Sequence, residues 1–402
     1  MTLNGTAGQE WRNWSGSLRF TPGKMAYPGD EGEVIELVRQ ARANGKKVRP
    51  VGTGHSSSPI VNTDGLLISA ERMKGLSAYD RERMEATLGP GMAMKEAGDA
   101  LLGIGMAFPN QGDVNVQRVI GAISTGTHGT GRGLHRLSSM LVGGRLVTAD
   151  GSVLEFGEGD GHRLLRAVRL SLGALGIFTS ITLRLMPACI LHRQEWCTTF
   201  DLSRERLEDL ERVDRRSDFY WYPRSDRVKL RTWSPPGEEP DIPRAKVVKE
   251  ATGWSGDTLS RERSIRYEEM EYEMPEDEGM ECFEEVRERM MAHHRRDVGW
   301  RVLVRTVAAD DTFLSQSYGR PTVVISIHHN ASLPYWGFFQ DIEEIFLEHH
   351  GRPHWAKKHS LTAERLRPLY PQWGRFISVR RDLDPEGLFL NPYLRSLLGE
   401  EA

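Results

Sequence analysis

Residues 51–58, with the sequence VGTGHSSS, decide the fold prediction. Two glycines and three serines surround a single histidine, His55, directly after an apolar run that predicts a strand. Glycine lets backbone N–H groups approach a phosphate closely, and serine hydroxyls add further donors. The segment therefore predicts a loop that holds a pyrophosphate beside His55, and a plain tight turn with a solvated histidine is the alternative that the spacing alone leaves open.

A second segment of small polar residues follows at 121–131, with the sequence GAISTGTHGTG. The order of its glycines does not fit the G-x-G-x-x-G dinucleotide fingerprint, and no G-x-x-x-x-G-K-[ST] phosphate loop occurs in the chain. Two phosphate-friendly segments in one unit are harder to explain as coincident turns than either segment alone. The pair therefore indicates that phosphates are held, but by neither of these two common motifs.

Helix and strand patterns around both segments predict a compact α+β unit over residues 1–187. An apolar stripe at helical spacing predicts a helix over residues 31–45, which ends at Gly45, a residue suited to a left-handed cap. Asp150-Gly151 is a strong signal for a two-residue hairpin turn between two alternating strands. Further helices are expected at 95–105 and 162–176, and further strands at 46–52, 65–70, 84–89 and 176–185.

The second half of the chain predicts another α+β domain, over residues 188–375. The polar, proline-rich stretch 233–250 reads as a surface loop or a lid. Residues 280–296 carry an apolar stripe typical of a helix, and 302–308 and 322–329 read as buried strands. Residues 376–402 are expected to return to the first domain.

Composition sets the class of partner. The chain has 402 residues and a formal net charge of -3, so it has no bulk attraction to nucleic acid or to an anionic membrane, and a small-molecule partner is expected. Its 3 cysteines form no CxxC pair, which favours a reducing compartment. With no run of 18 apolar residues and no secretory leader, we expect a cytoplasmic protein without membrane insertion.

Five further stretches extend the pattern across nearly the whole chain, from Trp14 to Leu398. They are PIVNTDG at 59–65, LVTADGSVLEF at 146–156, LGALGIFTSITL at 172–183, GRPHWAKKH at 351–359 and LDPEGLFLNPYL at 383–394. Together with the two glycine-rich segments, they resemble the aldonolactone oxidase group of FAD-linked oxidases, which includes gulonolactone oxidase and the alditol oxidases. The resemblance implies an α+β fold with a vanillyl-alcohol-oxidase-type (PCMH-type) FAD-binding domain at 1–187, completed by about 376–402, and a cap domain over the substrate.

The resemblance also implies how FAD is held. In the group, the histidine of the GHS motif is bonded to the 8α-methyl carbon of the flavin, and His55 occupies that position. No cysteine lies in the second glycine-rich segment, so a single covalent bond is expected. The other candidate FAD contacts are Gly52, Thr53, Gly54, Ser56, Ser57, Gly121, Ser124, Thr125, Gly126, His128 and Asn391.

The catalytic residues that the resemblance implies are Lys357 and His354 of the HWAK motif and Arg305 on a cap strand. Lys357 would hold the substrate oxygen as a fixed cation or, if desolvated, act as a base. Arg305, in the middle of an apolar strand, would be costly to bury without a polar partner such as a substrate oxygen or the flavin. These roles predict hydride transfer from a CH–OH carbon to flavin N5, with dioxygen or another acceptor taking the electrons.

One position departs from the pattern of the group. The glutamate expected two residues before Arg305 is Leu303, which neither accepts a hydrogen bond nor takes a proton. His328 or His329 is a candidate substitute, although two neighbours on a strand point to opposite faces, so at most one faces the site. A different substrate, handled by a remodelled tailoring oxidase or dehydrogenase, and a noncatalytic flavin-binding redox protein are the alternatives. No histidine pair has the carboxylate spacing of a known metal site, so no metal is expected.

Overall fold

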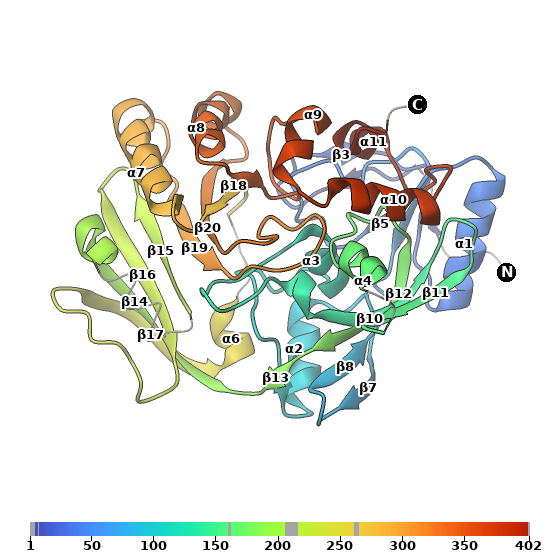
Figure 1. Cartoon of the computed structure of the whole chain (residues 1–402), viewed down its shortest axis with the longest axis horizontal. Coiled ribbons are helices and arrows are strands. Elements are labelled where there is room, and N and C mark those ends of the chain that lie inside the picture. The colour runs from blue at the N-terminus through green and yellow to red at the C-terminus, as the bar shows by residue number, and fades with distance from the viewer. Residues whose placement is uncertain (1–4, 7, 160–161, 206–215, 261–264, 401–402) are drawn as a thin grey trace.

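The computed structural model describes residues 5–6, 8–159, 162–205, 216–260 and 265–400. The first half of the chain forms two main sheets with helices around them, and the second half forms one large sheet (Figure 1). No helix in the described ranges is both long and apolar enough to cross a membrane.

A four-stranded sheet carries the first glycine-rich segment at the end of one strand. Its order is β1-β4-β6-β5, and β4, β6 and β5 run parallel. The strands are β1 (Gly5–Thr6), β4 (Lys24–Ala26), β5 (Val48–Val51) and β6 (Leu66–Ser69). Helix α1 (Glu31–Ala43) packs beside the sheet and is followed by Gly45 at φ +63°, which confirms the predicted helix and its end. β2 (Trp11–Arg12) and β3 (Arg19–Phe20) form a separate short ribbon.

The second sheet is antiparallel, in the order β11-β10-β12-β8-β7. Its strands are β7 (Leu76–Asp80), β8 (Glu85–Leu88), β10 (Leu141–Val147), β11 (Val153–Gly157) and β12 (Ile177–Arg184). The sequence missed β7 because this edge strand is almost wholly exposed and has no apolar alternation. The hairpin of β10 and β11 is confirmed, but its two-residue turn is wrong: five residues connect the strands, closed by the N–H of Thr148 bonding the carbonyl of Ser152.

Of three helices in the first half, one confirms a predicted helix and two differ from the prediction. α2 (Met94–Leu102) confirms one prediction. α3 (Val119–Thr125) takes up the first residues of the second glycine-rich segment, which was expected to be a loop. α4 (Arg163–Val168) is much shorter than expected, because Leu172 and Gly173 adopt positive φ angles of 53° and 65° that end the helical path. The short elements nearby are β9 (Met106–Ala107), β13 (Met186–Pro187) and the 3₁₀ turn η1 (Leu137–Met140).

The second half is built on an eight-stranded antiparallel sheet in the order β17-β14-β16-β15-β19-β20-β18-β21. Its strands are β14 (Ile190–Thr199), β15 (Ser217–Tyr222), β16 (Arg227–Ser234), β17 (Lys246–Trp254), β18 (Tyr267–Pro275), β19 (Val302–Val307), β20 (Thr322–Asn330) and β21 (Arg352–Pro353). β19 and β20 confirm two predicted strands. The loop expected at 233–250 is confirmed over residues 235–245, which connect β16 and β17, while the two ends of the stretch belong to these strands.

Two helices, α7 (Gly279–Arg289) and α8 (Trp336–Glu348), cover one face of this sheet (Figure 1). α7 ends in a π-helical turn, Met290–His294, and confirms the helix expected at 280–296. Phe283, Val286 and Met290 are fully buried, as its apolar stripe predicts. The opposite face of the sheet is left to meet the first half of the chain. The short helix α6 (Ser255–Leu259) follows β17.

The C-terminal segment returns to the first half of the chain (Figure 1). Its helices are α9 (Ala363–Leu366), α10 (Trp373–Leu383) and α11 (Pro392–Leu398), with the 3₁₀ turn η3 (Arg367–Leu369). Buried Arg49 donates to the carbonyls of Gly173 and Phe389 and so joins this segment to two others. Leu388 and Phe389 share a core with α1. The return agrees with the expectation, and the domain boundaries themselves stay a prediction.

Candidate functional site

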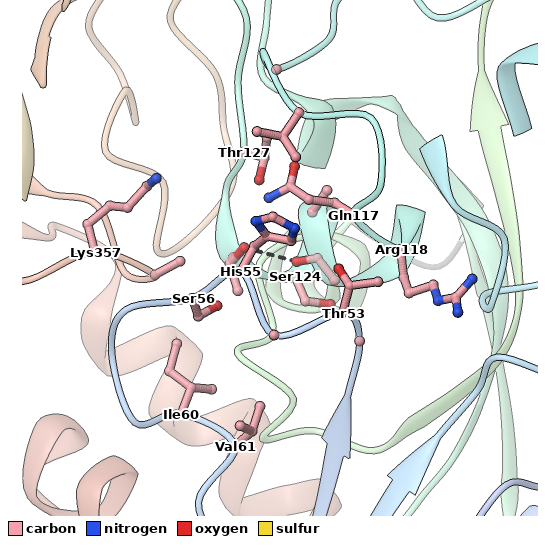
Figure 2. A pocket seen from close by; sticks show the side chains of 18 of the residues that line it. Thr53, His55, Ser56, Ile60, Val61, Gln117, Arg118, Ser124, Thr127 and Lys357 are labelled. Atoms are coloured by element: carbon pink, nitrogen blue, oxygen red, sulfur yellow. Dashed lines mark hydrogen bonds between the residues drawn. The ribbon is translucent and has the colours of Figure 1, made fainter. Parts of the chain in front are cut away.

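A long cavity lies between the first half of the chain and the uncovered face of the large sheet. It encloses about 1580 Å³, part of which is open to solvent. Figure 2 shows His55 between Lys357 on one side and Gln117 and Ser124 on the other. Its lining includes both the loop after β5 and Lys357 of the HWAK motif, so the predicted cofactor site and the predicted substrate site share one cavity. No residue of 233–250 lines it, so a lid role for that stretch is wrong.

The loop after β5 presents free donors to the cavity. In the part of the chain that is described, the backbone N–H groups of residues 53–56 have no protein acceptor. Gly54 adopts φ +72°, and a Cβ there would lie 2.8 Å from the ring of Trp11. Unpaired N–H groups in a strained turn form an anion-binding nest. The loop therefore fits the pyrophosphate of a dinucleotide cofactor.

The structure brings most of the predicted cofactor residues to this cavity. Those that line it are Gly52, Thr53, Gly54, His55, Ser56, Gly121, Ser124, Thr125 and His128. Ser57, Gly126 and Asn391 do not line it, which corrects their assignment as contacts. The Ser57 N–H bonds Ala356, the Gly126 carbonyl accepts from Arg136, and Asn391 caps α11 while its amide donates to carbonyls of residues 59, 60 and 62. Ser57 and Asn391 thus hold the segment that follows β5, and Gly126 ends α3.

His55 is held as a neutral imidazole. Burial, and then the charge of Lys357, lowers the pKa of His55 to about 4. The ring of Trp14 stacks on it with centroids 5.1 Å apart. A neutral ring keeps a nitrogen lone pair available, which a nucleophilic histidine requires.

Lys357 forms an ion pair with Glu269 of β18 at the substrate end of the cavity. Burial opposes the ammonium charge, but Glu269 and then Glu271 outweigh it and raise the pKa of Lys357. The same pairing overcomes the effect of burial on Glu269 and lowers its pKa to about 2. Of the two roles that the sequence left open for Lys357, this geometry favours the fixed cation.

His328 faces the cavity, and His329 does not. His328 Nδ1 lies 3.1 Å from the carbonyl oxygen of Arg301, and Nε2 lies 3.3 Å from Glu269 Oε1. His328 is thus held between a main-chain carbonyl and a carboxylate. His329 packs on the other face against Phe338 of α8, so its assignment to the substrate is wrong.

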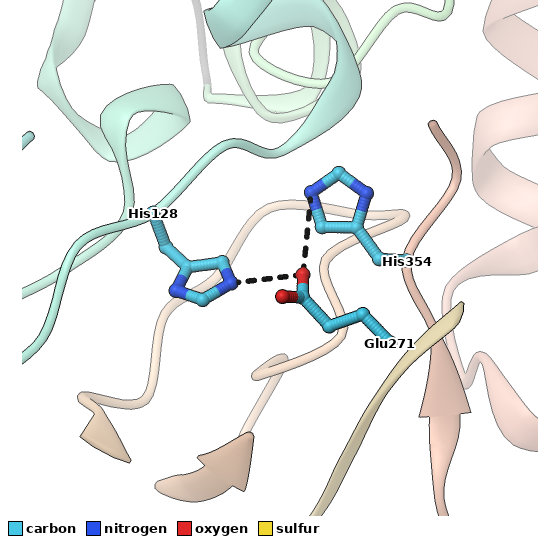
Figure 3. Close-up of side chains that lie close together, drawn as sticks. All are labelled: His128, Glu271 and His354. Atoms are coloured by element: carbon cyan, nitrogen blue, oxygen red, sulfur yellow. Dashed lines mark hydrogen bonds and ion pairs between the residues drawn. The ribbon is translucent and has the colours of Figure 1, made fainter. Parts of the chain in front are cut away.

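His128, Glu271 and His354 form a buried triad in the wall of the cavity, and Figure 3 shows the three side chains together. Glu271 Oε1 lies 3.1 Å from His128 Nε2 and 3.9 Å from His354 Nε2. Burial alone would raise the pKa of Glu271, but His128 and His354 hold it well below its usual value. His128 Nδ1 lies 2.9 Å from the carbonyl oxygen of Gly129.

The residue types of this triad are those of metal sites, but its hydrogen bonds differ from those of a ligand set. A histidine that binds a metal normally donates from its other ring nitrogen. His354 Nδ1 instead accepts the N–H of Ala356 at 3.1 Å, so Nε2 carries the hydrogen and has no lone pair to offer. The geometry therefore favours a cluster built on the hydrogen bond between His128 and Glu271, with His354 beside it, over a ligand set.

Neutral His354 predicts a dependence of stability on pH. Burial lowers the pKa of His354 to about 4 from its ordinary value of 6.5, so between these two values the unfolded chain binds a proton that the native state does not bind. As pH falls from about 6.5 to about 4, this residue should cost the native state about 2–3 kcal/mol. In the variant His354→Asn, the amide oxygen can still accept from Ala356. As pH is lowered over this range, the unfolding temperature of the variant should fall less than that of the wild type. An equal fall in both proteins between pH 7.5 and pH 4 would contradict the assignment.

Arg305 is held by carboxylates of the protein. It pairs with Asp113, from the loop before α3, and with Asp218 of β15 at 3.0 Å. Burial disfavours its charge, but Asp113 and then Asp218 outweigh this and raise the pKa of Arg305. The protein itself therefore supplies the polar partner of Arg305 that was expected to come from a substrate or the flavin. Leu303 lines the cavity two residues earlier.

Three carboxylates that sequence reasoning missed line the cavity: Asp113, Glu269 and Glu271. Glu269 and Glu271 alternate with apolar residues along β18, and that period of two was the signal available for finding them. Asp113 lies in a loop and carries no comparable signal.

Comparison with known proteins gives two family matches. Residues 242–397 match the family described as D-arabinono-1,4-lactone oxidase, and residues 22–157 match the family described as FAD binding domain. L-gulono-1,4-lactone dehydrogenase of Mycobacterium tuberculosis is 33% identical over 97% of this chain and 99% of its own length. L-gulonolactone oxidase of Mus musculus is 28% identical over 98% of this chain and 99% of its own length.

A crystal structure of cholesterol oxidase from B. sterolicum superposes with a TM-score of 0.85 at 14% identity, covering 98% of this chain and 97% of that one. This likeness concerns the fold, and it confirms the expected α+β class of vanillyl-alcohol-oxidase-type FAD proteins. Together with the family matches, it shows that the cavity described above lies in a fold that binds FAD.

Proposed function

Since the chain belongs to the aldonolactone oxidase family of FAD-linked oxidoreductases, we propose that it oxidises a CH–OH group of a sugar lactone or an alditol. The observation that carries the proposal is the Lys357–Glu269 ion pair, which faces the same cavity as the nest of free N–H groups and His55. A charged group for the substrate oxygen and a cradle for the cofactor phosphates thus share one space.

We propose that FAD is attached covalently through His55 and through no second residue. The support is the neutral imidazole at the end of the nest and its stacking on Trp14. Gly52, Thr53, Gly54 and Ser56 would hold the phosphates, and Gly121, Ser124 and Thr125 would contact the cofactor from α3. When bound, FAD would accept the hydride from the carbon that bears the hydroxyl group, and the hydroxyl proton would leave to water through the open part of the cavity.

The chain supplies the electrostatics of the reaction. The ammonium of Lys357 stabilises negative charge that develops on the substrate oxygen, and Glu269 keeps that ammonium charged and in place. Glu269 also supplies to the cavity the carboxylate that Leu303 lacks. His328, fixed between Glu269 and the carbonyl of Arg301, donates a hydrogen bond to the pair and orients it.

The proposal is tested by anaerobic mixing of the purified holoprotein with L-gulono-1,4-lactone, with xylitol and with acidic derivatives of both classes. The expected result is loss of the visible flavin absorbance with at least one of them. Admission of air then distinguishes an oxidase, which recovers its colour and yields hydrogen peroxide, from a dehydrogenase, which needs an added acceptor. A flavin that stays oxidised with every lactone and polyol, neutral or acidic, rejects the proposal.

The variant His55→Ala should bind FAD without a covalent bond and oxidise substrate more slowly. A covalent imidazole substituent makes the flavin a stronger oxidant, so its loss should lower the midpoint potential. Acid precipitation should leave the flavin in the supernatant for the variant and in the pellet for the wild type. The matched control His359→Ala, which changes a histidine of the chain that does not line the cavity, should keep its flavin in the pellet. An equal potential in both proteins would contradict the role of His55.

A further inference from the structure

Among the described residues, five basic side chains other than histidine line the cavity, and four of them have partners within the protein. Arg305 pairs with Asp113 and Asp218, and Lys357 pairs with Glu269. The remaining two satisfied cations lie elsewhere along the cavity: Arg118 pairs with Glu71 and Glu96, and Arg49 donates to main-chain carbonyls. The fifth cation is Arg301.

Arg301 has no carboxylate partner and no side-chain hydrogen bond within the described residues. Its Nε is buried and unpartnered. The guanidinium lies 4.2 Å from the ring centroid of Tyr220 and 6.0 Å from that of Trp300, so two aromatic rings restrict its position. An arginine held in place with an unused donor beside a cavity costs free energy unless a ligand supplies the acceptor.

The position of Arg301 connects it with the reacting end of the cavity. Arg301, Leu303 and Arg305 are spaced two apart on β19 and the residue before it, so they share the face that lines the cavity. The carbonyl of Arg301 holds His328, whose other nitrogen contacts Glu269 of the Lys357 pair. Leu303 therefore lies between two arginines, at the position where the pattern of the aldonolactone oxidase group has a glutamate. These three side chains present no negative charge to the cavity.

We infer that the substrate carries an anionic group, a carboxylate or a phosphate, that Arg301 binds while Lys357 faces the hydroxyl group to be oxidised. This inference rests on the proposed function and narrows its substrate class to acidic sugars and polyols. The planar fork of a guanidinium matches both groups with paired N–H donors. The unpartnered Nε is one of these donors.

The test uses three probes of one carbon skeleton: neutral D-glucitol, D-gluconate with a carboxylate, and D-glucitol 6-phosphate. Their binding to the holoprotein is measured by calorimetry without oxygen, and their oxidation by the rate of flavin reduction. At least one acidic probe should bind about 10- to 100-fold more tightly than D-glucitol, the range of a charged hydrogen-bonded contact. Comparison of D-gluconate with D-glucitol 6-phosphate shows whether Arg301 recognises a carboxylate or a phosphate.

Arg301→Gln should remove that preference, so that the acidic probes bind no more tightly than D-glucitol. Leu303→Glu, which places a carboxylate beside Arg301, should reduce acidic binding by a similar factor even if Arg301→Gln fails to fold. The matched control Arg227→Gln, at an exposed arginine of β16 outside the cavity, should keep the preference.

Equal affinity for the three probes, or an acidic preference that survives Arg301→Gln, overturns the inference. If neutral lactones or alditols reduce the flavin while the acidic probes do not bind, the proposed function stands and the inference fails. If acidic probes bind through Arg301 and no polyol or lactone reduces the flavin, the inference stands and the proposed function fails.

Discussion

Replacement of Lys357 by methionine is expected to lower kcat/KM by about 10²- to 10³-fold, the loss typical of one electrostatic contact to the reacting oxygen. The ammonium is fixed by Glu269 and lines the cavity, so its removal takes away the charge that faces the substrate. FAD binding should persist, because the nest at 53–56 does not depend on this side chain. Steady-state kinetics and the flavin content of Lys357→Met measure both quantities.

Lys358→Met is the matched control for this variant. Lys358 is the next residue, but it lies 3.5 Å from Glu268 and over the ring of Tyr335, and it does not line the cavity. Its loss should lower stability, since Glu268 is fully buried, and should leave turnover within a few-fold of wild type. Full activity of Lys357→Met, or equal loss of activity in both variants, would exclude the assigned role.

Arg136→Met is expected to lower the free energy of unfolding by about 3–5 kcal/mol, because it leaves buried carboxylates without their cation. Arg136 is fully buried and pairs with Glu273 at 2.7 Å and Asp310 at 3.0 Å. It also donates to the carbonyl of Gly126 at the end of α3 and to Gln316. This side chain therefore joins the cofactor side of the cavity to the large sheet.

The control is Arg132→Met. Arg132 pairs with Glu276 at 2.6 Å, but its side chain is 43% exposed, and exposed pairs contribute about 0–1 kcal/mol. Denaturant unfolding of both variants measures the difference. Similar losses in the two proteins would contradict the importance of the buried network.

Local signals in the sequence were sufficient for several elements of the first half of the chain. The glycines and histidine of residues 51–58, the stripe and cap of α1 and the hairpin of β10 and β11 depend on neighbours in the chain, and the structure has all three. The length of α4 could not be predicted in the same way. Its apolar pattern continues to residue 176, but positive φ angles at Leu172 and Gly173, set by tertiary packing, turn the chain away.

β18 shows why the carboxylates at the substrate end of the cavity could not be predicted from the sequence. Its sequence alternates glutamate with methionine or tyrosine, and charged residues are almost never fully buried unless paired, so one exposed face would be expected. The structure instead buries both faces. Glu269, Glu271 and Glu273 each meet a basic group from a distant segment, respectively Lys357, His128 and Arg136. Pairing across such separations leaves no trace in a single sequence.

The most direct test of the account is to precipitate the wild-type holoprotein with acid, digest the pellet and locate any flavin by peptide mass spectrometry. The account predicts a yellow pellet and one flavin adduct, on the peptide that contains His55. A freshly purified, folded protein with no flavin in pellet or supernatant would contradict it.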